Sequence, residues 1–125
     1  MYIIITKILT LGDYFMKKIG IINCFNVSQR CSSSGCFKAA YNKTGSFERY
    51  KDEDIQVISF VHCNGCSENS VDQVLARAER MEKVGVDTIH LSTCVKSKCP
   101  YYDEFMEKLS ENYDVVGYSH GKKKK

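Results

Sequence analysis

Four short apolar runs divide the sequence, and each is followed within three positions by a cysteine or a histidine. Such runs, bounded by polar residues, predict buried strands. They span residues 19–22, 55–61, 86–91 and 115–118. The first three lead into Cys24, Cys63 and Cys94, and the fourth leads into His120. We therefore expect four strands whose ends carry potential metal ligands.

Apolar residues at helical spacing lie between these runs. Two stripes predict helices that turn one face toward a core: Val71, Val74, Leu75, Ala78 and Met81, then Tyr102, Phe105, Met106 and Leu109. Ser70 with Gln73 predicts a capping box, Gly85 a helix stop, and Pro100 the first residue of the second helix. Residues 36–41 and 47–50 predict shorter helical turns in the first connection.

The resulting order of alternating strands and helices predicts an α/β fold. Short links between the elements favour a four-stranded, mainly parallel sheet with right-handed crossovers. We expect helices on its faces, in a flavodoxin-like or Rossmann-like layering. At 125 residues the chain is long enough for one domain.

The two ends of the chain differ from its body. The apolar stretch in residues 1–15 is broken by Lys7 and Asp13 and lacks a cleavage site, so it predicts neither a signal peptide nor a membrane span. Met16 is followed by two lysines and the first strand, which favours residues 1–15 as an N-terminal extension, or else as an extra edge strand. Residues 122–125 form a lysine tail that we expect to be solvated.

Charge gives little support to a polyanionic partner. The net charge is +3, and the four lysines of the tail account for it, leaving a body that is about neutral. Acidic and basic residues are mixed along each segment, whereas nucleic-acid binders cluster basic residues on one face. We expect neither a nucleic-acid nor a membrane partner.

Cysteine usage points to metal or thiol chemistry. Seven cysteines are an odd number, which argues against a framework of disulfides. Without a secretory signal they should be reduced thiols in the cytoplasm. So many thiols are difficult to explain by packing alone.

The predicted topology gathers these thiols. Carboxyl ends of parallel strands lie on one edge of a sheet, which is also where open α/β sheets bind ligands. Cys24, Cys63, Cys94 and His120 should meet there, and the remaining cysteines lie in the loops beyond: Cys31, Cys36, Cys66 and Cys99. Cys63-Asn64-Gly65-Cys66 is a C-x-x-C, a spacing that lets two thiolates hold one ion.

Other spacings narrow the kind of site. Cys31 and Cys36, like Cys94 and Cys99, have four residues between them, which also suits paired ligands. A second C-x-x-C and the ferredoxin run of cysteines are both missing, so neither a zinc ribbon nor that ferredoxin is favoured. His90 lies inside a predicted strand, where a core role is favoured over a ligand role, and His62 is undecided between the two.

Several stretches together resemble a known family. KKIGIINC, GCFKAAYNKTGSFERY, ISFVHCNGC, VGVDTIHLSTC, CPYYDEF and VVGYSHG make residues 17–121 similar to the CGGC domain family, described as a metal-binding domain rich in cysteine and histidine. Asn64 replaces the first glycine of the name-giving motif, while both of its cysteines are present. The resemblance implies that residues 16–121 form a metal-binding domain, and it identifies neither the metal nor a reaction.

Three functional classes follow from these observations. The first is a metal-binding protein that holds zinc, or alternatively an iron–sulfur cluster, through thiolates. We assign its candidate ligands to seven positions: Cys24, Cys36, Cys63, Cys66, Cys94, Cys99 and His120. The second is a thiol–disulfide redox protein that uses Cys63 and Cys66. The third is an interaction module with a structural metal.

Whether the chain catalyses a reaction stays open. The sequence contains no Gly-rich phosphate loop, no paired carboxylates and no Ser-His-Asp set, so hydrolase and kinase chemistry have no support. The one proline is at position 100, placed to start a helix, whereas a thioredoxin-like enzyme needs a cis-proline opposite its motif. This disfavours the redox class relative to metal binding.

Overall fold

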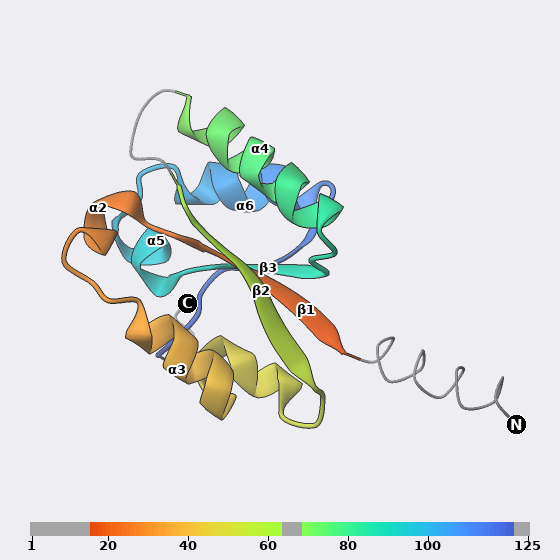
Figure 1. Cartoon of the computed structure of the whole chain (residues 1–125). Coiled ribbons are helices and arrows are strands. Elements are labelled where there is room, and N and C mark those ends of the chain that lie inside the picture. The colour runs from red at the N-terminus through yellow and green to blue at the C-terminus, as the bar shows by residue number, and fades with distance from the viewer. Residues whose placement is uncertain (1–15, 64–68, 122–125) are drawn as a thin grey trace, which may run out of the picture.

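The computed structural model describes residues 16–63 and 69–121 and shows an all-parallel sheet between two layers of helices (Figure 1). Four strands make the sheet in this part of the chain, in the order β2-β1-β3-β4. Their bounds are Lys17–Asn23 for β1, Ile55–His62 for β2, Thr88–Leu91 for β3 and Asp114–Val116 for β4. The prediction of an α/β fold with a parallel sheet is confirmed.

Strand β1 lies in the middle and fixes the level of the strand ends. Asn23 is opposite His62 of β2, and Ile22 is opposite Leu91 of β3. The next residues along each chain segment therefore leave the sheet at the same edge. This register brings Cys24, Cys63 and the segment after Leu91 to neighbouring positions.

Helices cover both faces of the sheet. Helix α3 (Ser34–Asn42) and the 3₁₀ helix η1 (Gly45–Tyr50) lie on one face, and α4 (Ser70–Lys83) and α6 (Tyr102–Ser110) lie on the other (Figure 1). Two short helices, α2 (Phe25–Ser28) and α5 (Thr93–Lys98), follow β1 and β3 directly. No helix within residues 16–63 and 69–121 is long and apolar enough to cross a membrane.

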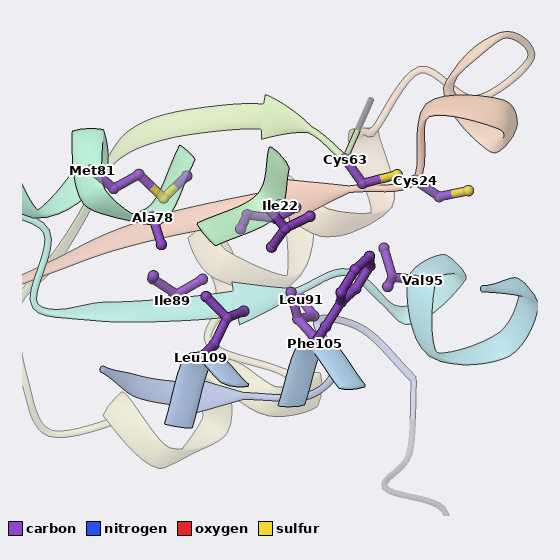
Figure 2. Packing of buried hydrophobic residues seen from close by; sticks show 11 residues of the cluster. Ile22, Cys24, Cys63, Ala78, Met81, Ile89, Leu91, Val95, Phe105 and Leu109 are labelled. Carbon is purple, nitrogen blue, oxygen red and sulfur yellow. The ribbon is translucent and has the colours of Figure 1, made fainter. Parts of the chain in front are cut away.

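The predicted helical stripes form the larger of two core clusters. Val74, Ala78 and Met81 from α4 meet Phe105 and Leu109 from α6, and all five are at most 1% exposed. They pack on the strands over three residues that Figure 2 labels: Ile22, Ile89 and Leu91. Burying side chains of this size stabilises the fold by about 1.5–3 kcal/mol each.

The second core, on the other face, encloses His90. Its ring stacks on Phe47 at a centroid distance of 4.2 Å, and its two nitrogens are hydrogen bonded to Ser46 Oγ (2.8 Å) and Tyr50 Oη (2.9 Å). Burial disfavours the charged imidazolium and lowers the pKa of His90 to about 4. The predicted core role of His90 is confirmed.

Two predicted strand boundaries are wrong. β3 begins at Thr88 rather than at Val86, because Asp87 binds Lys18 of β1 through both its backbone N–H and its carboxylate Oδ2. β4 ends at Val116, so His120 lies four residues beyond it rather than at the strand end. Tyr102 Oη donates a hydrogen bond to the Gly117 carbonyl (2.9 Å), so this carbonyl does not continue the hydrogen-bond ladder of the sheet.

The helix starts also differ from prediction. Asn69 occupies the N-cap position of α4, and Ser70 is the first helical residue. The predicted capping box, with Ser70 as the N-cap, is therefore wrong. Pro100 lies in the turn before α6 rather than in its first position. Proline disfavours helical backbone in the residue before it. Cys99 is accordingly extended and α5, a helix that the apolar pattern did not predict, ends at Lys98.

Candidate metal centre

Three cysteines follow directly from neighbouring strands. Cys24 comes after β1 and Cys63 after β2, and they are 3% and 1% exposed. Figure 2 shows both side chains beyond the strand ends, beside α5. Cys94 lies in the first turn of α5, which starts two residues after β3, and its side chain is partly buried. Three strands in register thus place three thiols at one edge.

The thiols of Cys63 and Cys94 act electrostatically on the thiol of Cys24. Burial raises the pKa of Cys24 above its usual value, hydrogen bonds from the Val27 and Asn26 amides oppose this, and the neighbouring thiols of Cys94 and Cys63 raise it further. The Cys63 sulfur accepts a hydrogen bond from the Phe25 amide at 3.4 Å. At neutral pH, Cys24 is therefore a protonated thiol in the metal-free protein.

Asn23 joins the ends of β1 and β3 next to these thiols. Its side chain is 1% exposed, and Oδ1 accepts hydrogen bonds from Cys94 Sγ (2.9 Å), Ser92 Oγ (3.0 Å) and the Cys24 amide (2.8 Å). Its Nδ2 donates to Ser33 Oγ at 3.0 Å. One buried amide thus holds the start of α5, the end of β1 and the loop before α3.

The other predicted ligands occupy different surroundings. Cys36 lies in α3 on the opposite face of the sheet, 4% exposed and 3.1 Å from Ser119 Oγ. Its pKa is raised by burial, with opposition from the Ser119 hydrogen bond and smaller contributions from Cys94 and Cys31. Cys99 is half-buried at the margin of the α4–α6 cluster.

His120 and Cys31 are both exposed. The His120 amide donates to Thr93 Oγ1 (3.0 Å), and Thr93 Oγ1 donates to the His120 carbonyl (2.7 Å), so the backbone of His120 is held beside α5. Cys31 Sγ accepts a hydrogen bond from the Ser33 amide at 3.3 Å. Cys66 lies outside the described residues. The predicted ligands therefore divide between the two faces of the sheet, and Cys94 lies where the two groups meet.

Sequence reasoning missed Asn23 and Ser119. Both are buried polar residues that contact candidate thiols. A signal for Asn23 is available, since a polar residue that directly follows a buried strand and precedes a cysteine marks the strand end. Ser119 could not have been found, because its contact with Cys36 spans 83 positions and depends on where α3 lies.

Comparison with known proteins gives the family. The family model of the CGGC domain matches residues 18–120, which is most of the chain. The chain belongs to the CGGC domain family. An uncharacterized protein of Methanocaldococcus jannaschii is 32% identical over 108 residues, covering 78% of this chain and 80% of that protein. No solved structure gives a significant match.

The thiols of this CGGC domain suit a soft metal. Cys24, Cys63 and Cys94 follow three adjacent strands and lie at the same edge of the sheet. Thiolates are the ligands that zinc and iron–sulfur clusters use. Within residues 16–63 and 69–121, no group of three or more His, Cys, Asp or Glu side chains is arranged to hold an ion.

Proposed function

We propose that this CGGC domain binds a thiophilic metal at the carboxyl edge of its sheet, through Cys24, Cys63 and Cys94 together with Cys66. One observation carries the proposal: the register of β1 with β2 and β3 brings the cysteines that follow these three adjacent strands to one edge of the sheet. Packing alone does not require three thiols in one place. A shared cation gives a physical reason for them, because it stabilises all of the thiolates at once.

Metal binding at this site must displace protons. Cys24 is protonated at neutral pH, since burial raises its pKa, and zinc binds the thiolate form. The affinity for metal should therefore rise with pH. The thiolates of the site would place negative charge in a largely buried position, and a bound metal would supply the compensating positive charge.

Zinc is our first choice and an iron–sulfur cluster the second. Four thiolates complete a tetrahedral zinc site, and Cys24, Cys63, Cys66 and Cys94 supply that number. A four-cysteine set also suits a cluster. Cys99 packs against the same core cluster as Cys24 and Cys63 and is a candidate for a replacement ligand. Cys36 and His120 lie on the other side of β1 and are not among the ligands proposed for this metal. Any effect that they have on the metal would pass through Cys94.

A thiol–disulfide role for Cys63 and Cys66 is the alternative. Such a role needs a sulfur that an external disulfide or thiol can reach. Cys63 is 1% exposed, which disfavours attack at that sulfur. The low accessibility that disfavours the redox role is that of Cys63, since Cys66 lies outside the described residues.

Metal content of cysteine variants tests the proposal. The protein is purified without oxygen, its zinc and iron are measured per chain, and its visible spectrum is recorded. Cys63→Ser and Cys94→Ser should each lose most of the metal, because a serine hydroxyl is a poor ligand for a soft metal. Cys31→Ser is the matched control, since Cys31 is exposed, and it should keep the metal.

Two results would contradict the proposal. One is wild-type protein that holds no zinc or iron even when both are supplied during expression. The other is a full metal content in both Cys63→Ser and Cys94→Ser. Reduction of an added disulfide substrate at equal rates by the wild type and Cys94→Ser would instead favour the redox alternative, since a C-x-x-C catalyst does not need Cys94.

A further inference from the structure

A cleft opens between the carboxyl ends of β1 and β3, because the chain leaves these two strands toward opposite faces. After β1 it runs to α3 and η1 on one face, and after β3 it runs to α6 on the other (Figure 1). The strand order β2-β1-β3-β4 makes β1 and β3 the pair at which this change of direction occurs. Open α/β sheets bind ligands at such a point.

The cleft is large enough for a small metabolite. Its volume is about 360 Å³, near the lower end of the roughly 300–1,000 Å³ that ligand pockets span. Asn23 lines it from the end of β1, Cys36 from α3 and Cys94 from α5, and Val27 contributes an apolar surface. Gly35 also lines it, and a Cβ there would lie 3.2 Å from His120 Cδ2, so the glycine keeps this wall open.

The charge of the lining favours an anion. Arg30 and Lys98 both line the cleft, one from the segment after β1 and the other from α5. No carboxylate lines it in the part of the chain that the structure describes. Among the described lining residues, two cationic side chains and no carboxylate favour a positive potential in the cleft.

We propose that this cleft binds a small metabolite through an oxyanion group, either a phosphate or a carboxylate, held by Arg30 and Lys98. Arginine and lysine are the side chains that bind such groups with charge-assisted hydrogen bonds. The Ser97 hydroxyl, on the same helix as Lys98, provides a further donor. The rest of the metabolite would contact the walls of the cleft, and the cleft volume of about 360 Å³ limits its size.

This proposal is independent of metal binding, although Cys94 belongs to both regions. Arg30 and Lys98 are not among the proposed metal ligands, and both side chains are exposed. Their substitution should leave the fold and the buried thiols unchanged. The two proposals can therefore fail separately, provided that metal content is measured beside anion binding.

Titration with simple anions tests the cleft. Reduced wild-type protein is titrated with inorganic phosphate and, separately, with succinate, while backbone amide resonances are followed by NMR. We expect shifts concentrated at Gly35, Cys36, Thr93 and Cys94, with a Kd on the order of 1–10 mM for the better probe. Saturation by phosphate alone identifies a phosphate ligand, and saturation by succinate alone identifies a carboxylate ligand.

Charge-removing variants give the decisive comparison. Arg30→Gln and Lys98→Gln should each weaken binding about fivefold, and the double variant about 25-fold, as expected for partly solvated charges. The control is the double variant Arg80→Gln with Lys83→Gln, which removes the same charge from exposed positions at the end of α4. It should bind the anion as the wild type does.

Specific outcomes would overturn the anion site. One is the absence of saturable shifts at the cleft below about 50 mM of either probe. Another is an equal loss of affinity in the Arg80/Lys83 control and in the Arg30/Lys98 double variant, which would indicate a general effect of net charge. Wild-type protein that lacks metal but binds an anion in the cleft would contradict only the proposed metal function.

Discussion

Replacement of Asn23 by alanine should destabilise the fold more than any substitution of an exposed asparagine. The side chain is 1% exposed and accepts or donates four hydrogen bonds that connect β1, α5 and the loop before α3. Alanine removes all four and leaves the buried Cys24 amide without its acceptor at 2.8 Å. A buried donor without a partner costs about 1–3 kcal/mol.

The expected loss can be worked out from these bonds. The hydroxyls of Ser33 and Ser92 lose partners at 3.0 Å, and each such bond contributes about 1 kcal/mol. The thiol of Cys94 is a weak donor and adds less. Because hydroxyls can rotate toward other acceptors, we expect a total of about 3 kcal/mol. For a domain of about 100 residues this corresponds to a fall in Tm of about 10–15 °C.

Thermal and urea unfolding of the reduced protein measure this loss. Asn42→Ala is the matched control, since Asn42 is exposed at the end of α3, and its Tm should stay within about 2 °C of the wild type. A decrease in Tm of less than about 4 °C for Asn23→Ala would refute the role of this amide as the connection between the strand ends.

Two further predictions concern the face that carries α3. Burial keeps His90 neutral with a pKa near 4, against 6.5 in the unfolded chain, so the unfolded state gains protons first as pH falls. The free energy of unfolding should decrease by about 2 kcal/mol between pH 7.5 and pH 5, and an NMR titration that shows His90 protonated at pH 6 would contradict this. Gly45→Ala should lower Tm by more than Gly85→Ala in the same melts. Both glycines have positive φ, but a Cβ at Gly45 would lie 2.6 Å from the Ser119 carbonyl, whereas at Gly85 the nearest atom is Lys18 Cδ at 3.8 Å; equal losses would show that the backbone clash is relieved.

The sequence alone was sufficient to predict the parallel sheet and the apolar stripes of α4 and α6. Ile22, Val74 and Phe105 are buried where the apolar periodicity predicts, because a sheet between two layers of helices must bury one face of each helix. Boundaries depended on contacts between distant residues. Asp87 shortens β3 through its bonds to Lys18, 69 positions away, and no local pattern contains that information.

The site was predictable only as far as topology determines it. Parallel strands require that the residues after β1, β2 and β3 share an edge, and this places Cys24, Cys63 and Cys94 together. Topology does not specify on which face a loop cysteine lies. Cys36 points toward Ser119 on the α3 face because α3 follows β1 to that side of the sheet.

The position of Cys94 depends on a helix that the apolar pattern did not predict. α5 begins at Thr93, so Cys94 turns back toward the end of β1 instead of continuing along β3. Asn23 Oδ1 then receives the Cys94 thiol at 2.9 Å. A buried amide that accepts bonds from two segments has few alternative arrangements, since each lost bond would leave a buried polar group without a partner. The thiol edge is therefore held in place by a polar residue in the strand, and a search of the sequence for metal-binding residue types alone would have passed over it.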